Sequence, residues 1–475
     1  MIEISSKDTL YMYNLYHITK AFFPNEEIRQ NVDDGQEPLV RLVLEGGSCF
    51  SIPADEAGHS PDRQEIKRHV TKLTYDYLSS MTGRNLAWGM LTGVRPTKLA
   101  MQKLEAGMSE EEVIRFLVDT YGVSPSKARL GCEIADCEKK LLKRLDCKNG
   151  YSLYVGIPFC PSICSYCSFG SSPLDRWEDR MDLYMDALCR EVSAIGKAAK
   201  GRKLNTIYIG GGTPTTLNAE QLERLLSLLE KEFSFDDLLE FTVEAGRPDS
   251  ITAEKLEVLA RHPVTRISVN PQTMQQKTLD AVGRRHSVQD VKDVFRLART
   301  LGFKNINMDL IAGLPGENAA DMRDTLRQIE GLGPDSLTVH SLAIKRAAKF
   351  GQENRKIDLH SEIAQMMEES AAAAERMGLL PYYLYRQKNI AGNFENVGYA
   401  KVDKAGIYNI LIMEEKQTIL AAGAGASTKI VLPEKITLEN GRQTSLVRIE
   451  NVKDIAEYIG RIDEMIERKG EWLWR

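Results

Sequence analysis

YVGIPFCPSICSYCSFGSS, residues 154–172, places three cysteines within eight positions of the chain. Cys160, Cys164 and Cys167 follow the spacing C-x3-C-x2-C, directly after the apolar run LYVGIP. A short apolar run bounded by turn residues is typical of a buried parallel strand, and the two prolines that follow interrupt regular structure. Active sites of β/α barrels lie on such loops, at the carboxyl ends of the strands. The stretch therefore predicts a barrel strand followed by a loop that presents three thiols.

The number of cysteines indicates which metal group they would hold. A [4Fe–4S] cluster normally takes four cysteine ligands, and here Phe169 occupies the position where a C-x-C continuation would place the fourth. Three ligands leave one iron open to bind substrate or cofactor. Zinc is the alternative metal, but a structural zinc site takes four ligands, and no His or Cys occurs in the twenty residues after Cys167. Three unrelated thiols are the remaining interpretation. We expect an iron–sulfur cluster.

Composition limits the other possibilities. A chain of 475 residues suggests two to four domains at about 150 residues each. The net charge of −5 lacks the basic footprint of a nucleic-acid-binding protein. No apolar run approaches the roughly 18 residues of a membrane span, and the N-terminus lacks the pattern of a signal peptide. We therefore expect a cytoplasmic protein, in which thiols stay reduced. The remaining cysteines, which we interpret as small buried apolar residues, are Cys49, Cys132, Cys137, Cys147 and Cys189.

Downstream of the cysteines, apolar strand-like runs alternate with amphipathic helical stretches. With LYVGIP there are six strand–helix units, and this alternation predicts a parallel sheet covered by helices. The fold class expected is α/β, a partial (β/α)6 barrel that is open at one side. The strand-like runs fall at residues 153–158, 205–212, 239–246, 265–272, 305–316 and 335–344.

Polar residues and glycines cluster at the ends of these runs. The loop GGGTP, residues 210–214, would let backbone N–H groups approach an anion, although a tight turn is the simpler interpretation. Glu244 ends a strand, where a carboxylate is usually solvated or caps the next helix. Gln272 and Arg284 have planar, directional hydrogen-bonding groups. Asp309 is an acid within an apolar strand and needs a partner there.

These residues resemble a known family. C-x3-C-x2-C after an apolar strand resembles the signature of radical S-adenosylmethionine (SAM) enzymes, and Y-V-x-I-P-F-C is closer to the oxygen-independent coproporphyrinogen III dehydrogenases. The resemblance implies that Cys160, Cys164 and Cys167 ligate a [4Fe–4S] cluster, that SAM chelates the open iron, and that an electron from a donor such as flavodoxin or ferredoxin cleaves SAM. It counts Tyr154 with the three cysteines as catalytic. The residues it places near SAM are Tyr154, Tyr166, Gly211, Gly212, Thr213, Glu244, Gln272, Arg284, Asp309 and Ala343.

The ends of the chain suggest further units. We expect an α+β N-terminal domain of unknown role at 1–147, the barrel at 148–345 and an α+β C-terminal extension that closes the active site at 346–475. This layout resembles a long subgroup of the family with an N-terminal extension. In the stretch PYYLYRQ, Tyr382, Tyr383 and Tyr385 could stack on a flat macrocycle while Arg386 binds its propionates; an edge strand with packed tyrosines is the alternative. The turn GAGAST, residues 423–428, matches a glycine-rich segment of the family.

The resemblance predicts oxidative decarboxylation of coproporphyrinogen III to protoporphyrinogen IX, a step of anaerobic heme biosynthesis, with a tetrapyrrole or heme as partner and no membrane. Two departures count against this substrate: Gly156 and Phe169 stand where the best-known members have His and Cys. The rivals are a heme-binding chaperone and a radical SAM enzyme that methylates or opens heme. A radical SAM enzyme that modifies tRNA is a further class, and the net charge argues against it.

Overall fold

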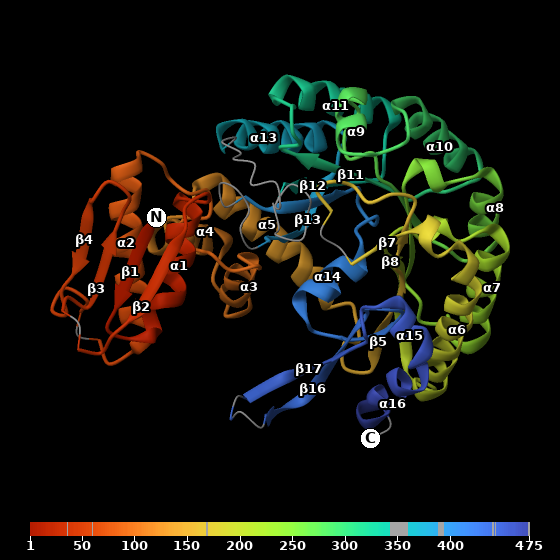
Figure 1. Cartoon of the computed structure of the whole chain (residues 1–475), viewed down its shortest axis with the longest axis horizontal. Coiled ribbons are helices and arrows are strands. Elements are labelled where there is room, and N and C mark those ends of the chain that lie inside the picture. Colours follow the sequence, from red (N-terminus) through yellow and green to blue (C-terminus); the bar gives the residue numbers. More distant parts are fainter. Residues whose placement is uncertain are drawn as a thin grey trace.

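The N-terminal part of the chain is a small α+β unit (Figure 1). The computed structural model describes residues 1–35, 37–58, 60–167, 170–342, 360–387, 394–438, 441 and 443–473. The first sheet has the order β2-β1-β3-β4, and α1 and α2 pack on it around a hydrophobic cluster that includes Ile4, Leu15 and Leu78. The elements are β1 (Ile2–Ser6), α1 (Thr9–Phe22), β2 (Ile28–Val32), β3 (Val40–Val43), β4 (Cys49–Ile52) and α2 (Arg63–Thr82).

Three helices connect this unit to the large sheet: α3 (Thr97–Glu105), α4 (Glu110–Tyr121) and α5 (Pro125–Leu142). Their buried side chains belong to the same hydrophobic cluster as the strands of the large sheet. Trp88 is completely buried in that cluster, and its Nε1 donates a hydrogen bond of 2.7 Å to the buried carboxylate of Glu395. The helices before residue 147 thus pack against the barrel as well as against the N-terminal sheet. The domain limits expected from the sequence stay a prediction.

The large sheet has eleven strands in the order β13-β14-β12-β11-β10-β9-β8-β5-β15-β16-β17. Its central part, from β12 to β15, is parallel throughout, and antiparallel pairs flank it at both ends. The predicted α/β class and the six predicted parallel strands are confirmed. The strands are β5 (Gly150–Ile157), β8 (Lys203–Gly211), β9 (Glu240–Gly246), β10 (Arg266–Val269), β11 (Ile306–Ala312), β12 (Ser336–Ser341), β13 (Leu380–Tyr385), β14 (Asn396–Ala400), β15 (Thr418–Ala422), β16 (Ser427–Thr437) and β17 (Gln443–Glu450).

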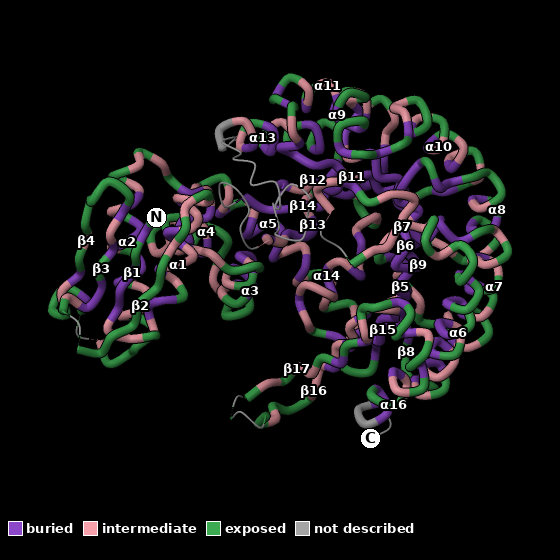
Figure 2. Tube along the Cα trace, viewed as in Figure 1, coloured by how far each residue is buried: buried purple, intermediate pink, exposed green. Residues whose placement is uncertain are grey.

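Helices follow the outer face of this sheet in an open arc (Figure 1). Several begin with a side-chain capping box, as at Asn218, Ser287 and Asn318, which satisfies amides that the first helical turn leaves free. Figure 2 shows their outer faces exposed and the strands buried. The helices of the arc are α6 (Met181–Ala198), α7 (Ala219–Glu232), α8 (Ala253–Arg261), α9 (Gln276–Ala281), α10 (Val288–Thr300), α11 (Ala319–Leu332) and α13 (His360–Arg376).

The C-terminal part of the chain returns to the first barrel strand. β15 pairs in parallel with β5, the strand that leads into the cysteines, and two short helices, α15 (Ile455–Gly460) and α16 (Ile462–Leu473), pack on α6. A buried ion pair holds them there, because Lys469 of α16 contacts the carboxylate of Glu191, and the two side chains are 2% and 0% exposed. Glu191 also accepts a hydrogen bond of 2.8 Å from the backbone N–H of Gly423, just after β15.

Among the described helices, none combines the length and the apolar character that crossing a bilayer requires.

Candidate functional site

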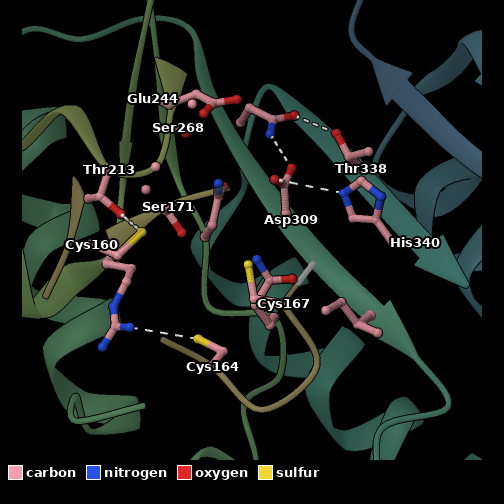
Figure 3. Close-up of a pocket in the computed structure, with 18 of the residues that line it drawn as sticks. Cys160, Cys164, Cys167, Ser171, Thr213, Glu244, Ser268, Asp309, Thr338 and His340 are labelled. Carbon is pink, nitrogen blue, oxygen red and sulfur yellow. Dashed lines mark hydrogen bonds and ion pairs between the residues drawn. The ribbon is translucent and has the colours of Figure 1, made fainter. Parts of the chain in front are cut away.

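A pocket of about 510 Å³ lies at the carboxyl ends of the parallel strands, within the size range of small-molecule and cofactor sites. Every predicted site residue that the structure describes lines it, and Ala343 lies outside the described residues, as does Phe169. Figure 3 shows the cysteines on one side and Asp309, Thr338 and His340 on the other. The predicted residues in the lining are Cys160, Cys164, Cys167, Tyr154, Tyr166, Gly211, Gly212, Thr213, Glu244, Gln272, Arg284 and Asp309.

The three thiols come from one short loop after β5. Cys160 ends the two-residue strand β6 (Phe159–Cys160), which pairs with β7 (Ser172–Pro173). Cys160 Sγ accepts a hydrogen bond of 3.5 Å from Thr213 Oγ1, and Cys164 Sγ accepts one of 3.6 Å from Arg247. Within the described residues no three Cys, His, Asp or Glu side chains converge on the space of a single metal ion. Three thiols around one cavity fit a multi-iron cluster better than a closed zinc site, which takes four ligands.

The glycine-rich loop packs directly on the cysteine strand. The N–H groups of Gly212 and Thr213 donate to the carbonyls of Ile157 and Phe159, at 2.8 and 2.7 Å. A Cβ at Gly212 would lie 2.4 Å from the Phe159 carbonyl oxygen, so only glycine permits this approach. The sequence left two interpretations of this loop open, an anion site and a tight turn. The N–H groups of Gly212 and Thr213 bond backbone carbonyls and fix the position of the strand that carries Cys160, whereas the N–H of Gly211 donates to the carboxylate of Glu244.

A stack of tyrosine rings and a buried acid form one wall. The rings of Tyr208 and Tyr408 stack at 4.4 Å, and Tyr154 stacks on both at 6.3 Å. The Tyr208 hydroxyl donates to the Glu244 carboxylate. Burial raises the pKa of Glu244 to about 7, and the neighbouring Asp309 adds to the shift. Glu244 therefore changes charge near neutral pH. Tyr408 lies on α14 (Ile407–Glu414), and nothing in its local sequence marks it as a site residue.

Several buried polar atoms of the pocket have no hydrogen-bond partner. Gln272 Oε1, Ser268 Oγ and Asn270 Oδ1 are buried and unpaired, and all three residues line the cavity. Gln272 also has a φ of +69°, which is uncommon outside glycine and concentrates at functional sites. Because buried polar groups are nearly always hydrogen-bonded, these atoms indicate a polar ligand. The amine and hydroxyl groups of SAM would donate to the two amide oxygens, and its carboxylate would accept from the Ser268 hydroxyl.

Two further predicted residues have defined partners. Arg284 Nε donates to the Tyr166 hydroxyl at 3.2 Å, so two predicted SAM contacts brace each other. Asp309 accepts a hydrogen bond of 2.7 Å from Asn307 and lies 3.8 Å from His340 Nε2. Burial raises the pKa of Asp309, but the contacts with His340 and Asn307 lower it more, so the pKa lies below its ordinary value.

The tyrosine-rich stretch divides between two environments. Tyr383 and Tyr385 line the pocket, and the Tyr385 hydroxyl lies 3.4 Å from His340 Nδ1. Arg386 turns away, because its guanidinium donates to the carbonyl of Leu91, and it is not in the lining. The tyrosines at 383 and 385 thus lie where the predicted platform would be, whereas Arg386 is directed away from the pocket, and the neighbouring cation Lys388 lies outside the described residues. β13 is also an edge strand of the sheet, as the alternative interpretation expected.

Gly156, one of the two positions at which the resemblance expected another residue, packs against the turn that follows β15. A Cβ at Gly423 would lie 2.5 Å from the Gly156 carbonyl oxygen, and the Tyr184 hydroxyl donates to that same oxygen at 2.7 Å. Gly156 itself is not in the pocket lining, whereas His340 is. The sequence analysis did not single out His340, although it lies within the sixth predicted strand and next to the last residue of β12.

Comparison with known proteins agrees with this geometry. The radical SAM superfamily matches residues 154–329. The oxygen-independent coproporphyrinogen-III oxidase-like protein HemZ of Bacillus subtilis is 41% identical over 87% of this chain and 83% of its own length. The heme chaperone HemW of the same organism is 34% identical over 58% of this chain and 70% of its own. Among solved structures, coproporphyrinogen III oxidase HemN of Escherichia coli, a radical SAM enzyme, aligns with a TM-score of 0.53 and 24% identity, over 70% and 73% of the two chains; it supports the fold.

Proposed function

Because the chain belongs to the radical SAM superfamily and, within it, to the family of the coproporphyrinogen-III oxidase-like protein HemZ, we propose that it is a radical SAM enzyme that decarboxylates coproporphyrinogen III to protoporphyrinogen IX. The observation that carries the proposal is the pocket itself, which joins three thiols, unpaired buried polar atoms and a tyrosine-lined wall in one cavity.

The residues of the pocket take separate parts in this proposal. Cys160, Cys164 and Cys167 hold a [4Fe–4S] cluster, and Gln272 and Arg284 bind the polar groups of SAM. When bound, the cluster and SAM supply a carbon radical by one-electron cleavage of SAM. Tyr154 stacks on the rings of Tyr208 and Tyr408 and helps to keep water away from the site of that reaction. An external donor such as flavodoxin or ferredoxin supplies the electron.

The substrate half of the pocket would bind a carboxylate through His340. Arg386 faces away, and Arg284 is assigned to SAM. The other two arginines of the lining have partners, since Arg247 is paired with Asp249 and Arg266 donates to Ser336. The His340 side chain is 25% exposed, lines the cavity and is held between Asp309 and Tyr385. The glycine at position 156 has no side chain that could make this contact. For each propionate, the overall change removes one hydrogen atom from the β-carbon, one CO₂ and one electron, which an acceptor takes, and leaves a vinyl group.

The test is anaerobic incubation of the reconstituted protein with SAM, dithionite and either coproporphyrinogen III or heme, followed by mass analysis of the tetrapyrrole. Loss of two CO₂ from coproporphyrinogen III supports the proposal, and the triple Cys→Ala variant serves as the inactive control. Tight heme binding without turnover would support a chaperone, the activity named for the relative HemW. Altered heme with untouched coproporphyrinogen would refute the proposal in favour of heme modification.

A further inference from the structure

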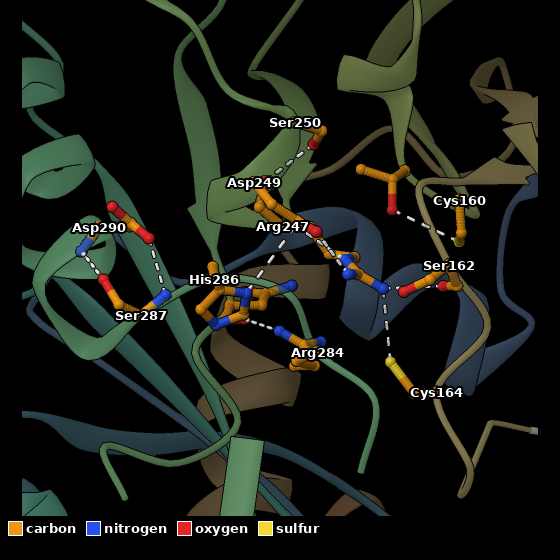
Figure 4. Close-up of polar contacts among 12 residues, drawn as sticks. Cys160, Ser162, Cys164, Arg247, Asp249, Ser250, Arg284, His286, Ser287 and Asp290 are labelled. Carbon is orange, nitrogen blue, oxygen red and sulfur yellow. Dashed lines mark hydrogen bonds and ion pairs between the residues drawn. The ribbon is translucent and has the colours of Figure 1, made fainter. Parts of the chain in front are cut away.

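A buried arginine that the catalytic scheme does not use contacts one of the three cysteines. Arg247 follows β9, next to the short 3-10 turn Pro248–Ser250, and its side chain is 5% exposed. Its Nη1 donates to the carbonyl of Ser162 at 2.8 Å and to Cys164 Sγ at 3.6 Å. Figure 4 shows the guanidinium directed from the β9 side into the cysteine loop. One charged group thus bonds both the backbone and a sulfur of the loop.

A carboxylate on the same turn holds the arginine in place. Arg247 Nε and Nη2 donate to the two oxygens of Asp249 at 2.9 and 2.5 Å. This fork-to-fork geometry fixes the plane of the guanidinium, so the remaining nitrogen points at the loop. Burial raises the pKa of Asp249, but contacts with His286 and Arg247 lower it more, and the pKa lies well below its usual range. Asp249 is therefore ionised, and the buried positive charge of Arg247 is balanced.

We propose that Arg247 is a positioning residue that keeps Cys164 in place as a ligand and raises the reduction potential of the cluster by donating a hydrogen bond to its sulfur. The inference rests on the cluster site of the proposed function, but not on the proposed substrate. Reduction adds negative charge to the cluster and its sulfurs, and a neighbouring cation with an N–H aimed at one of them stabilises the reduced state more than the oxidised state. Hydrogen bonds to the sulfurs are among the factors that set such potentials.

The test is an EPR-monitored redox titration of the full chain after anaerobic reconstitution, on the wild type and on Arg247→Gln. The glutamine removes the positive charge and the two parallel hydrogen bonds to Asp249. We expect the ratio of reduced to oxidised cluster at a fixed potential to fall at least tenfold, which corresponds to about 59 mV for one electron. Arg285→Gln is the matched control, because it removes the same charge from an exposed position in the nearby loop, and its potential should equal that of the wild type.

The outcomes separate this inference from the proposed function. If the wild type takes up no cluster, the cofactor assignment itself fails. If Arg247→Gln holds a full cluster at the wild-type potential, the role of Arg247 is refuted. If Arg247→Gln keeps its circular dichroism spectrum but loses the cluster, Asp249→Asn is titrated instead, since it retains the arginine and removes only the group that braces it. A lower potential in Asp249→Asn supports the proposal, and an unchanged potential overturns it.

Discussion

Replacing Gly212 by alanine tests whether the glycine loop positions the cysteine strand. The added Cβ would lie 2.4 Å from the Phe159 carbonyl oxygen and 2.9 Å from that of Ile157. Both obstacles are backbone atoms, so the two segments must separate by about 1 Å to reach an ordinary contact distance. That movement stretches the hydrogen bonds from Gly212 and Thr213 to the same two carbonyls and displaces the strand that ends at Cys160.

The magnitude follows from these contacts. Overpacking of a buried site destabilises by about 1–3 kcal/mol, and each of the two weakened hydrogen bonds adds about 0.5–1.5 kcal/mol, giving roughly 2–6 kcal/mol in all. For a chain of this length the unfolding entropy is about 1 kcal/mol per degree, so the Tm of the apoprotein should fall by roughly 2–6 °C. Because Cys160 moves, we also expect the iron bound per chain after reconstitution to fall at least twofold.

The assay is a thermal scan of the apoprotein together with iron analysis of the reconstituted protein. Gly170→Ala is the control: this exposed glycine lies just beyond the cysteine loop, and a Cβ there would meet nothing within 4 Å. It should match the wild type in both measurements. If Gly212→Ala also matched the wild type in Tm and in iron content, the packing role assigned to the glycine loop would be wrong.

Three further changes follow from the same structure. Lys469→Met leaves the buried carboxylate of Glu191 without its cation and should lower the free energy of unfolding, measured in urea, by about 3–5 kcal/mol. Adding Glu191→Gln should restore part of the lost stability. If the double variant instead lost the sum of the two single losses, the pairing would be contradicted. The pKa of Glu244 is raised to about 7, so the folded apoprotein holds a proton that the unfolded chain lacks between about pH 4.5 and 7. Its free energy of unfolding should therefore fall as pH rises through that window. Glu244→Gln should lose this pH dependence of stability, and a dependence equal to that of the wild type would argue against the raised pKa. Gln272→Ala removes an unpaired buried acceptor. It should weaken SAM binding about tenfold, measured by calorimetry, with little loss of bound iron. A SAM affinity equal to that of the wild type would show that Gln272 is not part of the site.

The sequence predicts the parallel part of the sheet well because its strands are local features. Each is a short apolar run, and residues toward the carboxyl halves of neighbouring parallel strands, such as Glu244 and Asp309, line the same cavity wherever they lie in the chain. β15 is different. Its sequence, TILAA, is apolar enough for a strand, but its neighbour β5 is remote in the chain, and no local pattern specifies that pairing.

The direction of side chains is the other feature of the site that the sequence alone does not predict. In the run Tyr383–Arg386 the tyrosines at 383 and 385 line the pocket and the arginine faces Leu91, as alternation along a strand dictates, but which face meets the cavity depends on the packing of β13. Arg247 lies in a loop between a strand and a helix, where the residue type alone gives no sign that its guanidinium reaches a cysteine. His340 could have been predicted, since it is a polar residue within the sixth predicted strand, residues 335–344.

The placement of β15 beside β5 has a consequence for synthesis of the chain on the ribosome. β5 emerges early, whereas its partner on one side is made about 270 residues later, roughly 15–50 s at about 5–20 residues per second. Until then that edge of β5 has unpaired backbone groups, and the turn after β15 that packs against Gly156 does not yet exist. The strand that leads into the cysteines would therefore gain this partner only after residue 422 has been made, and nascent chains stalled before residue 418 would carry an open strand edge of the kind that promotes aggregation.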